Sequence, residues 1–375
     1  MEFKAFEDSS QLFAKMMQNK NSEQLKRASL VRVVVLAAIC FFSDVSLAQT
    51  SVKGITKPTP GSWSIVLLPD TQCYSEAYPE VFMNQTEWIA KEKYTRNIRF
   101  VLHLGDITQN STHPEWVNAR QAMSVLDKAG IPYQMASGNH DIGAWGLSND
   151  RSSHFSDYFV QHGYGPNKKA RKVGESENAY QLLTIGEAKF ILLSLEFGPR
   201  EAVVEWANEV IAKHPGHYAI LVTHAYLYSD GTRYDCRTKM GPQKYNPCTY
   251  PVAKSPEGLN DGEQLWLKLV SKHPNFLCTF NGHDTTGNRT AYLRSTGEKG
   301  NDVHQIMVNY QCEYKPKGGG GFLRILEVQP DGKTVKVQDY SPYFDQWLTE
   351  SERNFTIKLD RDINKPLTIQ GGQNK

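Results

Sequence analysis

Five short motifs of acidic, amide and imidazole residues occur along this chain, each directly after an apolar run that predicts a buried strand. The motifs are Asp70-Thr71-Gln72, Gly105-Asp106, Gly138-Asn139-His140-Asp141, Thr223-His224 and Gly282-His283-Asp284. Strand ends in an α/β fold gather residues from distant sequence positions into one site, so we expect these side chains to meet. Carboxylate, amide and imidazole groups are donors that hold divalent cations. Five such motifs, spaced 36, 33, 85 and 59 residues apart, predict a metal centre.

The residue types suggest how two cations would be held. Two divalent ions about 3.5–4 Å apart share a bridging ligand, and a carboxylate with two oxygens suits that position. Asp106 is the candidate bridge, with Asp70 and Gln72 on one side of it. The ligands expected on the other side are Asn139, His224 and His283. Because neutral imidazoles leave the cation charge unquenched, a bound water can lose its proton near neutral pH.

His140 and Asp141 are the candidate catalytic residues. His140 directly follows the candidate ligand Asn139, so its side chain is expected to face the substrate and to protonate the leaving alkoxide. Asp141 is expected to orient His140 through a carboxylate–imidazole hydrogen bond. The glycines before Asp106, Asn139 and His283 are expected to let the backbone turn sharply into the site.

Alternating strands and helices are expected to position these motifs. The predicted strands that precede the motifs or join them are 65–69, 98–104, 131–135, 190–195, 219–222 and 276–280. The predicted helices are 79–96, 114–128, 201–213 and a fourth through Leu265, Trp266 and Leu269, opened by a capping box of Asn260 and Glu263. The β-rich end has predicted strands at 290–294, 303–310, 323–328, 334–339 and 355–359. This order predicts packed sheets with helices outside, and long polar loops at 143–178 and 229–258 that shape a cleft.

The motifs resemble those of a known family. The series LPDTQ, GD, GNHD, TH and GH, over residues 62–285, resembles the calcineurin-like metallophosphoesterase superfamily, whose usual pattern is DxH, GD, GNH[DE], H and GHxH. The resemblance implies an α/β fold, a four-layer α/β/β/α sandwich of two mixed sheets flanked by helices. It also implies hydrolysis of phosphomonoesters or phosphodiesters by a metal-bound hydroxide at a dinuclear centre. The implied roles are Asp70 on the first metal, Asp106 as the bridge, Asn139, His224 and His283 on the second, and His140 at the transition state or leaving group.

Two departures from the family pattern affect the first metal. Gln72 stands where the family has the histidine of DxH, and Thr285 stands where it has the last histidine of GHxH. Losing two imidazoles weakens a site for Zn²⁺ or Fe²⁺ and favours Mn²⁺, with Mg²⁺ also compatible. A competing hypothesis is therefore a binding protein on the same fold with a degraded first site. Gln109 occupies the position where purple acid phosphatases have a tyrosine, so an iron–tyrosinate centre is not expected.

Composition and the N-terminus bear on location and partners. The chain has 375 residues, 39% of them hydrophobic, and a formal net charge of +2. This charge does not favour a nucleic-acid surface, so a small phosphorylated substrate is expected. Basic residues, the apolar stretch 33–42 and the small residues Ser46 and Ala48 predict a signal peptide over 1–48, too short to span a bilayer. The mature chain is expected to be periplasmic or secreted, with a linker at 49–61 and one domain at 62–375, β-rich over 290–360.

Export would permit disulfides among the five mature cysteines. Cys236 and Cys248 flank a polar loop, and bridging them would contribute about 3 kcal/mol. Cys278 and Cys312 lie on separate predicted strands and could pair if those strands are neighbours, leaving Cys73 as the odd residue.

Three other polar residues have open interpretations. His103 is either a support for the Asp106 loop or a buried structural residue. Glu196 either lines the cleft or anchors a loop, and Asn110 is a candidate substrate contact.

Overall fold

The computed structural model describes residues 51–53, 57–159, 168–172, 175–311 and 318–368. The predicted signal peptide at 1–48 and Cys312 lie outside these ranges. Across the described ranges, every helix is too short or too polar to cross a bilayer.

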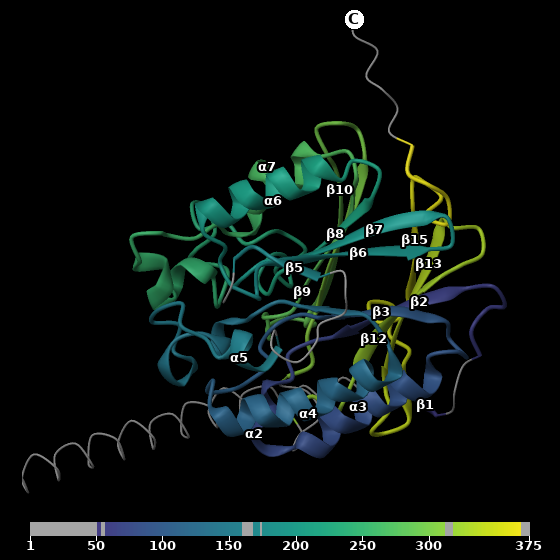
Figure 1. The fold of residues 1–375 in the computed structure, drawn as a ribbon, viewed down its shortest axis with the longest axis horizontal. Helices are drawn as coiled ribbons and strands as arrows, with labels where there is room; N and C mark the ends of the chain where they lie inside the picture. Colours follow the sequence, from purple (N-terminus) through teal and green to yellow (C-terminus); the bar gives the residue numbers. More distant parts are fainter. Residues whose placement is uncertain (1–50, 54–56, 160–167, 173–174, 312–317, 369–375) are drawn as a thin grey trace, which may run out of the picture. The chain divides into compact units, whose positions relative to one another are not determined.

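Two mixed β-sheets form the centre of the fold (Figure 1). The first sheet has eight strands: β1 (Ser51–Lys53), β2 (Trp63–Leu68), β3 (Ile98–His103), β4 (Tyr133–Met135), β12 (Leu323–Val328), β13 (Thr334–Ser341), β14 (Gln346–Leu348) and β15 (Phe355–Lys358). The second has seven: β5 (Lys168–Ala170), β6 (Ala179–Ile185), β7 (Ala188–Ser194), β8 (Tyr218–Val222), β9 (Phe276–Asn281), β10 (Thr290–Thr296) and β11 (Asp302–Val308).

Each sheet contains a parallel core. The first sheet runs β1-β14-β13-β12-β2-β3-β4, with β15 beside β13, and β2, β3 and β4 are parallel. The second runs β10-β11-β9-β8-β7-β6-β5, with β7, β8, β9 and β11 parallel. Parallel strands bring their carboxyl ends to the same edge, and every motif described above follows one of these strands.

Helices cover the outer faces of both sheets. The α-helices are α2 (Gln72–Ala77), α3 (Pro79–Glu92), α4 (His113–Ala129), α5 (Phe155–Phe159), α6 (Glu201–Lys213) and α7 (Gly262–Lys268). Short 3₁₀ turns are η1 (Asn139–Asp141), η2 (Ala144–Gly146), η3 (Pro247–Thr249), η4 (Pro251–Lys254) and η5 (Val270–Lys272). Local signals explain the bounds of α4, because Thr112 and Glu115 form a capping box and Gly130 ends the helix in a left-handed conformation.

The side chains of β2 show how the layers are built. Ile65 and Leu67 point into a core shared with the second sheet, where they meet residues such as Leu192. Val66 and Leu68 point the other way, into a core formed with α3 and α4. A third core packs α6 and α7 on the second sheet. Alternating strand residues therefore fill two cores each, and the predicted four-layer α/β/β/α sandwich is confirmed.

The structure differs from the sequence predictions at several features, among them the strands β5, β6 and β14 and the helix α5, which were not predicted. β1 lies within the predicted linker at 49–61 and pairs with β14, so part of that segment belongs to the sheet. The capping box of α7 is formed by Asp261 and Gln264, one residue later than predicted, because Asp261 accepts the hydrogen bond from the backbone N–H of Gln264. Helix α2 was not predicted, and Gln72 is its first residue.

Candidate metal centre

The five motifs lie at the carboxyl ends of parallel strands from both sheets. Asp70, Asp106 and Asn139 follow β2, β3 and β4 of the first sheet, whereas His224 and His283 follow β8 and β9 of the second. All five residues are buried. The site therefore lies where the edges of the two sheets meet, and each sheet contributes part of it.

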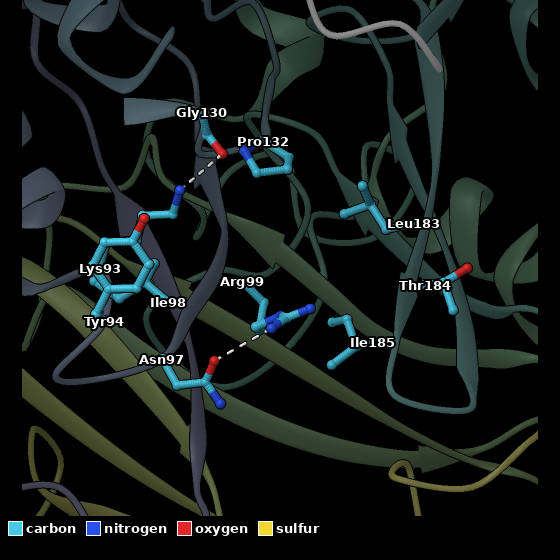
Figure 2. Close-up of a pocket in the computed structure, with 10 residues that line it drawn as sticks. All are labelled: Lys93, Tyr94, Asn97, Ile98, Arg99, Gly130, Pro132, Leu183, Thr184 and Ile185. Carbon is cyan, nitrogen blue, oxygen red and sulfur yellow. Dashed lines mark hydrogen bonds between the residues drawn. The ribbon is translucent and has the colours of Figure 1, made fainter. Parts of the chain in front are cut away.

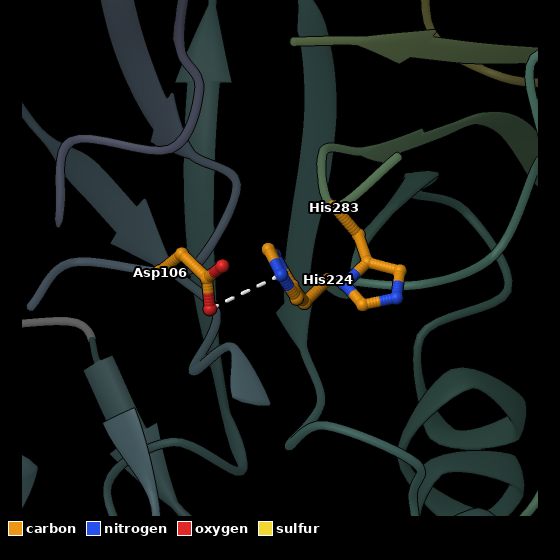
Figure 3. A group of neighbouring side chains, drawn as sticks. All are labelled: Asp106, His224 and His283. Atoms are coloured by element: carbon orange, nitrogen blue, oxygen red, sulfur yellow. Dashed lines mark ion pairs between the residues drawn. The ribbon is translucent and has the colours of Figure 1, made fainter. Parts of the chain in front are cut away.

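Asp106, His224 and His283 come together as one cluster. One potential ligand atom from each residue lies within 4.8 Å of the other two. Figure 3 shows the imidazole of His224 between the carboxylate of Asp106 and the ring of His283. The Nε2 atom of His224 is 3.2 Å from Oδ1 of Asp106, although hydrogen-bond geometry is not met and, among the described residues, this nitrogen has no hydrogen-bond partner.

Backbone carbonyls determine which imidazole nitrogens are available to a cation. His224 Nδ1 is 2.8 Å from the carbonyl oxygen of Leu104, and His283 Nε2 is 2.7 Å from that of Tyr245. A carbonyl only accepts, so these two nitrogens carry the protons. In the neutral rings, the lone pairs are then on Nε2 of His224 and Nδ1 of His283. Such outer hydrogen bonds are typical of metal-binding histidines.

Two buried amide oxygens complete the donor set. Asn139 Oδ1 and Gln72 Oε1 are both buried, and neither has a hydrogen-bond partner among the described residues. The amide nitrogen of Gln72 donates to Oδ2 of Asp106 at 3.0 Å, which places this side chain beside the predicted bridge. Buried polar atoms are normally satisfied, so the unpaired oxygen of Gln72 beside Asp106 and the unpaired oxygen of Asn139 both suit a divalent cation.

Asp70 joins the cluster through donors that the sequence did not reveal. Its Oδ2 atom accepts from the backbone N–H of His283 at 3.1 Å and from Nδ2 of Asn309 at 2.5 Å. Burial and the charge of Asp106 raise the pKa of Asp70 well above its ordinary value, and His224 opposes this. Asn309 follows β11, 239 residues further along the chain. Thr285 directly follows the GHD motif and is half-buried.

Burial and charge also shift the other titrating groups. Burial disfavours the charged form of Asp106, but His224 and His140 outweigh it and lower its pKa. Burial likewise opposes the imidazolium form of His224, but Asp106 and Asp70 outweigh it and raise its pKa to about 9. His283 shows the opposite result, because burial and the charge of His224 lower its pKa to about 3. Without a cation, His224 is therefore the imidazole of this cluster that carries a second proton.

Glycines are required here by close approach more than by sharp turns. A Cβ atom on Gly138 would lie 2.0 Å from Oδ1 of Asp106, and one on Gly282 would lie 2.0 Å from Oδ1 of Asp70. The left-handed conformations fall on the functional residues themselves, with φ of 36° at Asp70, 50° at Asp106 and 72° at His283. The prediction of sharp turns at the glycines is thus corrected for Gly138 and Gly282, although Gly105 does have a φ of 98°.

The structure gives His140 and Asp141 different partners from those predicted. His140 donates its backbone N–H to Asp106 at 3.0 Å, and its Nδ1 is 2.7 Å from the carbonyl oxygen of Gln109. The Asp141 carboxylate instead accepts from the backbone N–H groups of Ile107, Thr108 and Gly138 and from the Thr108 hydroxyl. The expected Asp141–His140 hydrogen bond is therefore wrong, because four donors around the motif occupy the carboxylate. Burial and Asp106 raise the pKa of Asp141 to about 6.

Three residues with open interpretations now have structural partners. His103 is buried, accepts at Nδ1 from the backbone N–H of Gly105 at 3.2 Å and lies 2.9 Å from the Thr71 hydroxyl, so it supports the Asp106 loop, as one of its two interpretations held, and the Asp70 motif as well. Glu196 anchors loops, since its carboxylate accepts from Arg200 at 2.8 Å and from Asn178 at 2.9 Å. The side-chain amide of Asn110 donates to Glu115 at 2.9 Å, and this residue also lines a cavity described next.

A surface cavity of about 540 Å³ lies beside the GNHD motif. It is lined by the segment after Gln109, by η2 and by residues 152–154. Its Trp145 side chain is 65% exposed and has a left-handed φ of 59°. The next residue, Gly146, is so close to the carbonyls of His140 and Gln109 that a Cβ there would lie 2.7–2.8 Å from them. The turn carrying Trp145 is therefore packed directly on the His140–Gln109 pair.

A second cavity, of about 300 Å³, lies away from the cluster (Figure 2). It is lined by residues at the start of β3, including Ile98 and Arg99, and by Leu183–Ile185 at the end of β6. Asp106 follows the other end of β3, so this cavity is at the opposite end of the strands from the metal-binding residues.

One predicted disulfide is present. Cys236 and Cys248 are bonded, with their Cα atoms 5.8 Å apart. Cys312 lies outside the described residues, and within them Cys278 is a buried free thiol. The pairing of Cys278 with Cys312, which depended on their strands being neighbours, therefore receives no support.

A family model, one curated protein and several solved structures match this chain. A family model described as calcineurin-like phosphoesterase matches residues 64–289. The "Uncharacterized protein YvnB" of Bacillus subtilis (strain 168) is 33% identical over 333 residues, which are 85% of this chain and 23% of that protein. This chain thus spans about a quarter of the length of that relative.

The solved structures that match this chain have lower sequence identity to it. Purple acid phosphatase PPD1 from yellow lupin (Lupinus luteus) is 16% identical, with a TM-score of 0.47 over 84% of this chain and 58% of that one. The 5'-nucleotidase precursor from Thermus thermophilus is 12% identical, with a TM-score of 0.39 over 80% of this chain and 54% of that one.

Proposed function

This chain belongs to the calcineurin-like phosphoesterase family, and we propose that it is a metal-dependent hydrolase of small phosphoric esters. The observation that carries the proposal is the convergence of Asp106, His224 and His283, with ligand atoms within 4.8 Å of one another. Carbonyl hydrogen bonds leave one lone pair on each imidazole for a cation.

Two divalent cations fit the available donors. The second would be held by Asp106, Asn139, His224 and His283, and the first by Asp70, Gln72 and Asp106. When bound, such a pair supplies an activated water and offsets charge on the phosphoryl oxygens. Since Gln72 brings an uncharged oxygen donor and Thr285 brings no imidazole, the first site favours Mn²⁺ over Zn²⁺ or Fe²⁺ and binds more weakly than the second.

We propose that His140 serves the leaving group. Its Nδ1–H is fixed on the Gln109 carbonyl, which directs Nε2 away from this loop. The ring is half-buried and so reachable by a ligand. A histidine held in this way can donate a proton from Nε2 to the departing oxygen, and general acid catalysis of this kind typically contributes about 10²–10⁴-fold. Asp141 acts as a positioning residue, because it ties the loop after β3 to Gly138.

A binding protein that has lost catalysis is the second candidate, and the changes at Gln72 and Thr285 motivate it. Against it stands the position of Gln72, whose amide donates to Asp106 at 3.0 Å while its oxygen is buried without a described partner. A residue that had lost its role at the centre would have no need to occupy this position.

Hydrolysis by the full chain separates the two candidates. The protein would be stripped of metal with a chelator and assayed on an aryl phosphate monoester and a bis-aryl diester, with Mn²⁺, Mg²⁺, Zn²⁺ or Fe²⁺ restored singly. We expect Mn²⁺ to restore turnover and Asp106→Asn to lower it at least about 100-fold, because the bridge loses its charge. Ligand binding without turnover for any ion would instead favour the binding protein.

Export is part of the same proposal. The signal-like segment 1–48 supports it, and so does the Cys236–Cys248 disulfide, because such bonds persist in oxidising compartments. N-terminal sequencing of the protein recovered from the periplasm or medium is expected to begin at Gln49. Recovery of the uncleaved chain from the cytoplasm would contradict it.

A further inference from the structure

The orientation of His283 depends on a loop outside the five motifs. The hydrogen bond from its Nε2 goes to the carbonyl of Tyr245, at 2.7 Å. Its ring also contacts Tyr234 and Tyr250, with ring centroids 5.7 and 5.8 Å apart, and Phe197 at 5.6 Å. One segment, residues 234–250, thus supplies both the hydrogen bond and most of the aromatic packing around this histidine.

This segment cannot hold its conformation through regular structure. Between residues 234 and 250, all of which the structure describes, the only helix or strand is the single turn η3. Tyr245 itself has a left-handed φ of 57°, which costs about 1–3 kcal/mol for a residue other than glycine. The carbonyl that directs His283 therefore belongs to a strained residue, and the surrounding contacts must maintain it.

The Cys236–Cys248 disulfide encloses that residue. The bridge spans 12 positions with Tyr245 between its ends. One end is anchored, since the backbone N–H of Cys236 donates to Asp261 at 2.7 Å, at the start of α7. At the other end, Asn246 accepts from the backbone N–H of Cys248 at 3.1 Å. Closing a loop of this length contributes about 3 kcal/mol, which is comparable with the strain at Tyr245.

We propose that the Cys236–Cys248 disulfide and Tyr245 are positioning elements for the second metal, acting through His283. This inference rests on the proposed metal centre. Reduction by a dithiol cleaves the S–S bond, gives two cysteine thiols and oxidises the reductant to its own disulfide. The Tyr245 carbonyl is then released, and His283 loses the hydrogen bond that directs Nδ1 toward the cation. Loss of an outer partner of this kind typically lowers metal affinity about 10–100-fold.

The test measures metal binding rather than activity. Mn²⁺ binding to the full chain would be followed by equilibrium dialysis and by electron paramagnetic resonance, which distinguishes a coupled pair from a single ion. We expect Cys236→Ser/Cys248→Ser, or reductant added to the native protein, to raise the dissociation constant of the tighter ion about 10–100-fold and to remove the coupled signal. The double variant should not respond further to reductant, which controls for other thiols.

A second pair of variants keeps the disulfide intact. Tyr245→Val places a β-branched residue at a left-handed φ that it rarely adopts, so it should weaken Mn²⁺ binding in the same way, and Tyr245→Asn, which tolerates that φ, should weaken it less. Met240→Val puts the same residue at an exposed position of the loop and is the matched control. Unchanged Mn²⁺ affinity in both the reduced protein and Tyr245→Val would overturn the inference. No Mn²⁺ binding by the native protein would instead refute the proposed metal centre.

Discussion

Three histidines of the site are each oriented by a hydrogen bond from one ring nitrogen to a backbone carbonyl. His140, His224 and His283 each place one ring nitrogen 2.7–2.8 Å from a backbone carbonyl. The carbonyl fixes the tautomer, so the other nitrogen is directed to a ligand without any competing side chain. Their proposed roles differ because their positions differ. His224 and His283 are buried near Asp106, where a cation would bind, whereas His140 is partly exposed and can reach a substrate.

Because His140 is proposed to act on the leaving group and not on the metal, its substitution should lower turnover without changing metal binding. His140→Ala removes the group proposed to protonate the leaving oxygen but no cation ligand. We expect kcat to fall about 10²–10⁴-fold while the Mn²⁺ content stays unchanged by elemental analysis. His217→Ala is a suitable control, since His217 is in the turn before β8, at the opposite end of that strand from His224. Loss of metal from His140→Ala would place this residue among the ligands instead.

Metal uptake should release a proton from His224. Asp106 and Asp70 outweigh burial and raise its pKa to about 9 in the metal-free cluster. At pH 7 the ring is therefore charged, and a cation must displace the proton from Nε2. Calorimetric titration with Mn²⁺ in buffers of different ionisation enthalpy is expected to report proton release at pH 7, with the contribution of His224 lost above pH 9. Zero proton release at pH 7 would show that His224 is not a ligand.

Residue types predicted the ligand cluster because Asp, Asn and His side chains can bind a metal ion wherever they occur in the sequence. The partners of those side chains could not be predicted in the same way. The carbonyls of Leu104, Gln109 and Tyr245 have no signature, since every residue has one. Asn309 meets Asp70 across 239 residues, and only the pairing of the strands brings it there. The false Asp141–His140 bond has the same origin, because sequence adjacency was taken for contact.

At the scale of elements, the loops after the parallel strands hold most of the unusual backbone. Of the left-handed residues other than glycine, Asp70, Asp106, Trp145, Tyr245 and His283 all belong to the centre or to the loops beside it. Although the seven-residue strand β6 was missed, most longer strands and helices were predictable from apolar periodicity, as for α6 at Glu201–Lys213. Three-residue strands such as β1, β5 and β14 were not, because they are too short for a pattern and depend on a neighbouring strand.

Gly138 tests how closely the strand-end loops must approach each other. A methyl group there would lie 2.0 Å from Oδ1 and 2.3 Å from the backbone nitrogen of Asp106. We expect Gly138→Ala to displace the bridge, abolish Mn²⁺ binding and lower the free energy of unfolding by about 1–3 kcal/mol. Gly216→Ala has no heavy atom within 4 Å of its added Cβ and should behave as the native protein in denaturant titration and dialysis. Normal Mn²⁺ binding by Gly138→Ala would refute the close packing.

Trp145 tests whether η2 forms part of the substrate site. Its exposed ring borders the cavity beside His140, so it can stack on an aromatic leaving group. Trp145→Ala is expected to raise KM for an aryl phosphate about 2- to 10-fold, with little effect on an alkyl phosphate. Tyr94→Ala removes a ring that is 85% exposed at the cavity of Figure 2 and should leave both KM values unchanged. Equal losses for the two esters would argue against stacking.

At the scale of the whole molecule, the centre joins two sheets that otherwise meet through an apolar core. The first sheet brings Asp70, Asp106 and Asn139, and the second brings His224 and His283. Strand alternation predicted the two layers, but which strands lie side by side depends on pairings between segments far apart in sequence, such as β12 with β2. A cation held from both sheets would act as a cross-link between them, so its removal should lower the stability of the entire fold.

Thermal unfolding should therefore depend on metal and pH together. In the metal-free protein the pKa of His224 is about 9, against an ordinary value of 6.5. Its charged form thus stabilises the fold fully below about pH 6.5, and this contribution is lost as the pH rises through 9. The bound cation replaces that charge, and at about 100 times its dissociation constant it adds about 2.7 kcal/mol, or roughly 5 °C in Tm. We would measure Tm by calorimetry at pH 6.5 and 9, with chelator or with Mn²⁺. The difference in Tm between the Mn²⁺-bound and the metal-free protein should be larger at pH 9. An equal difference at the two pH values would contradict the link between His224 and the cation.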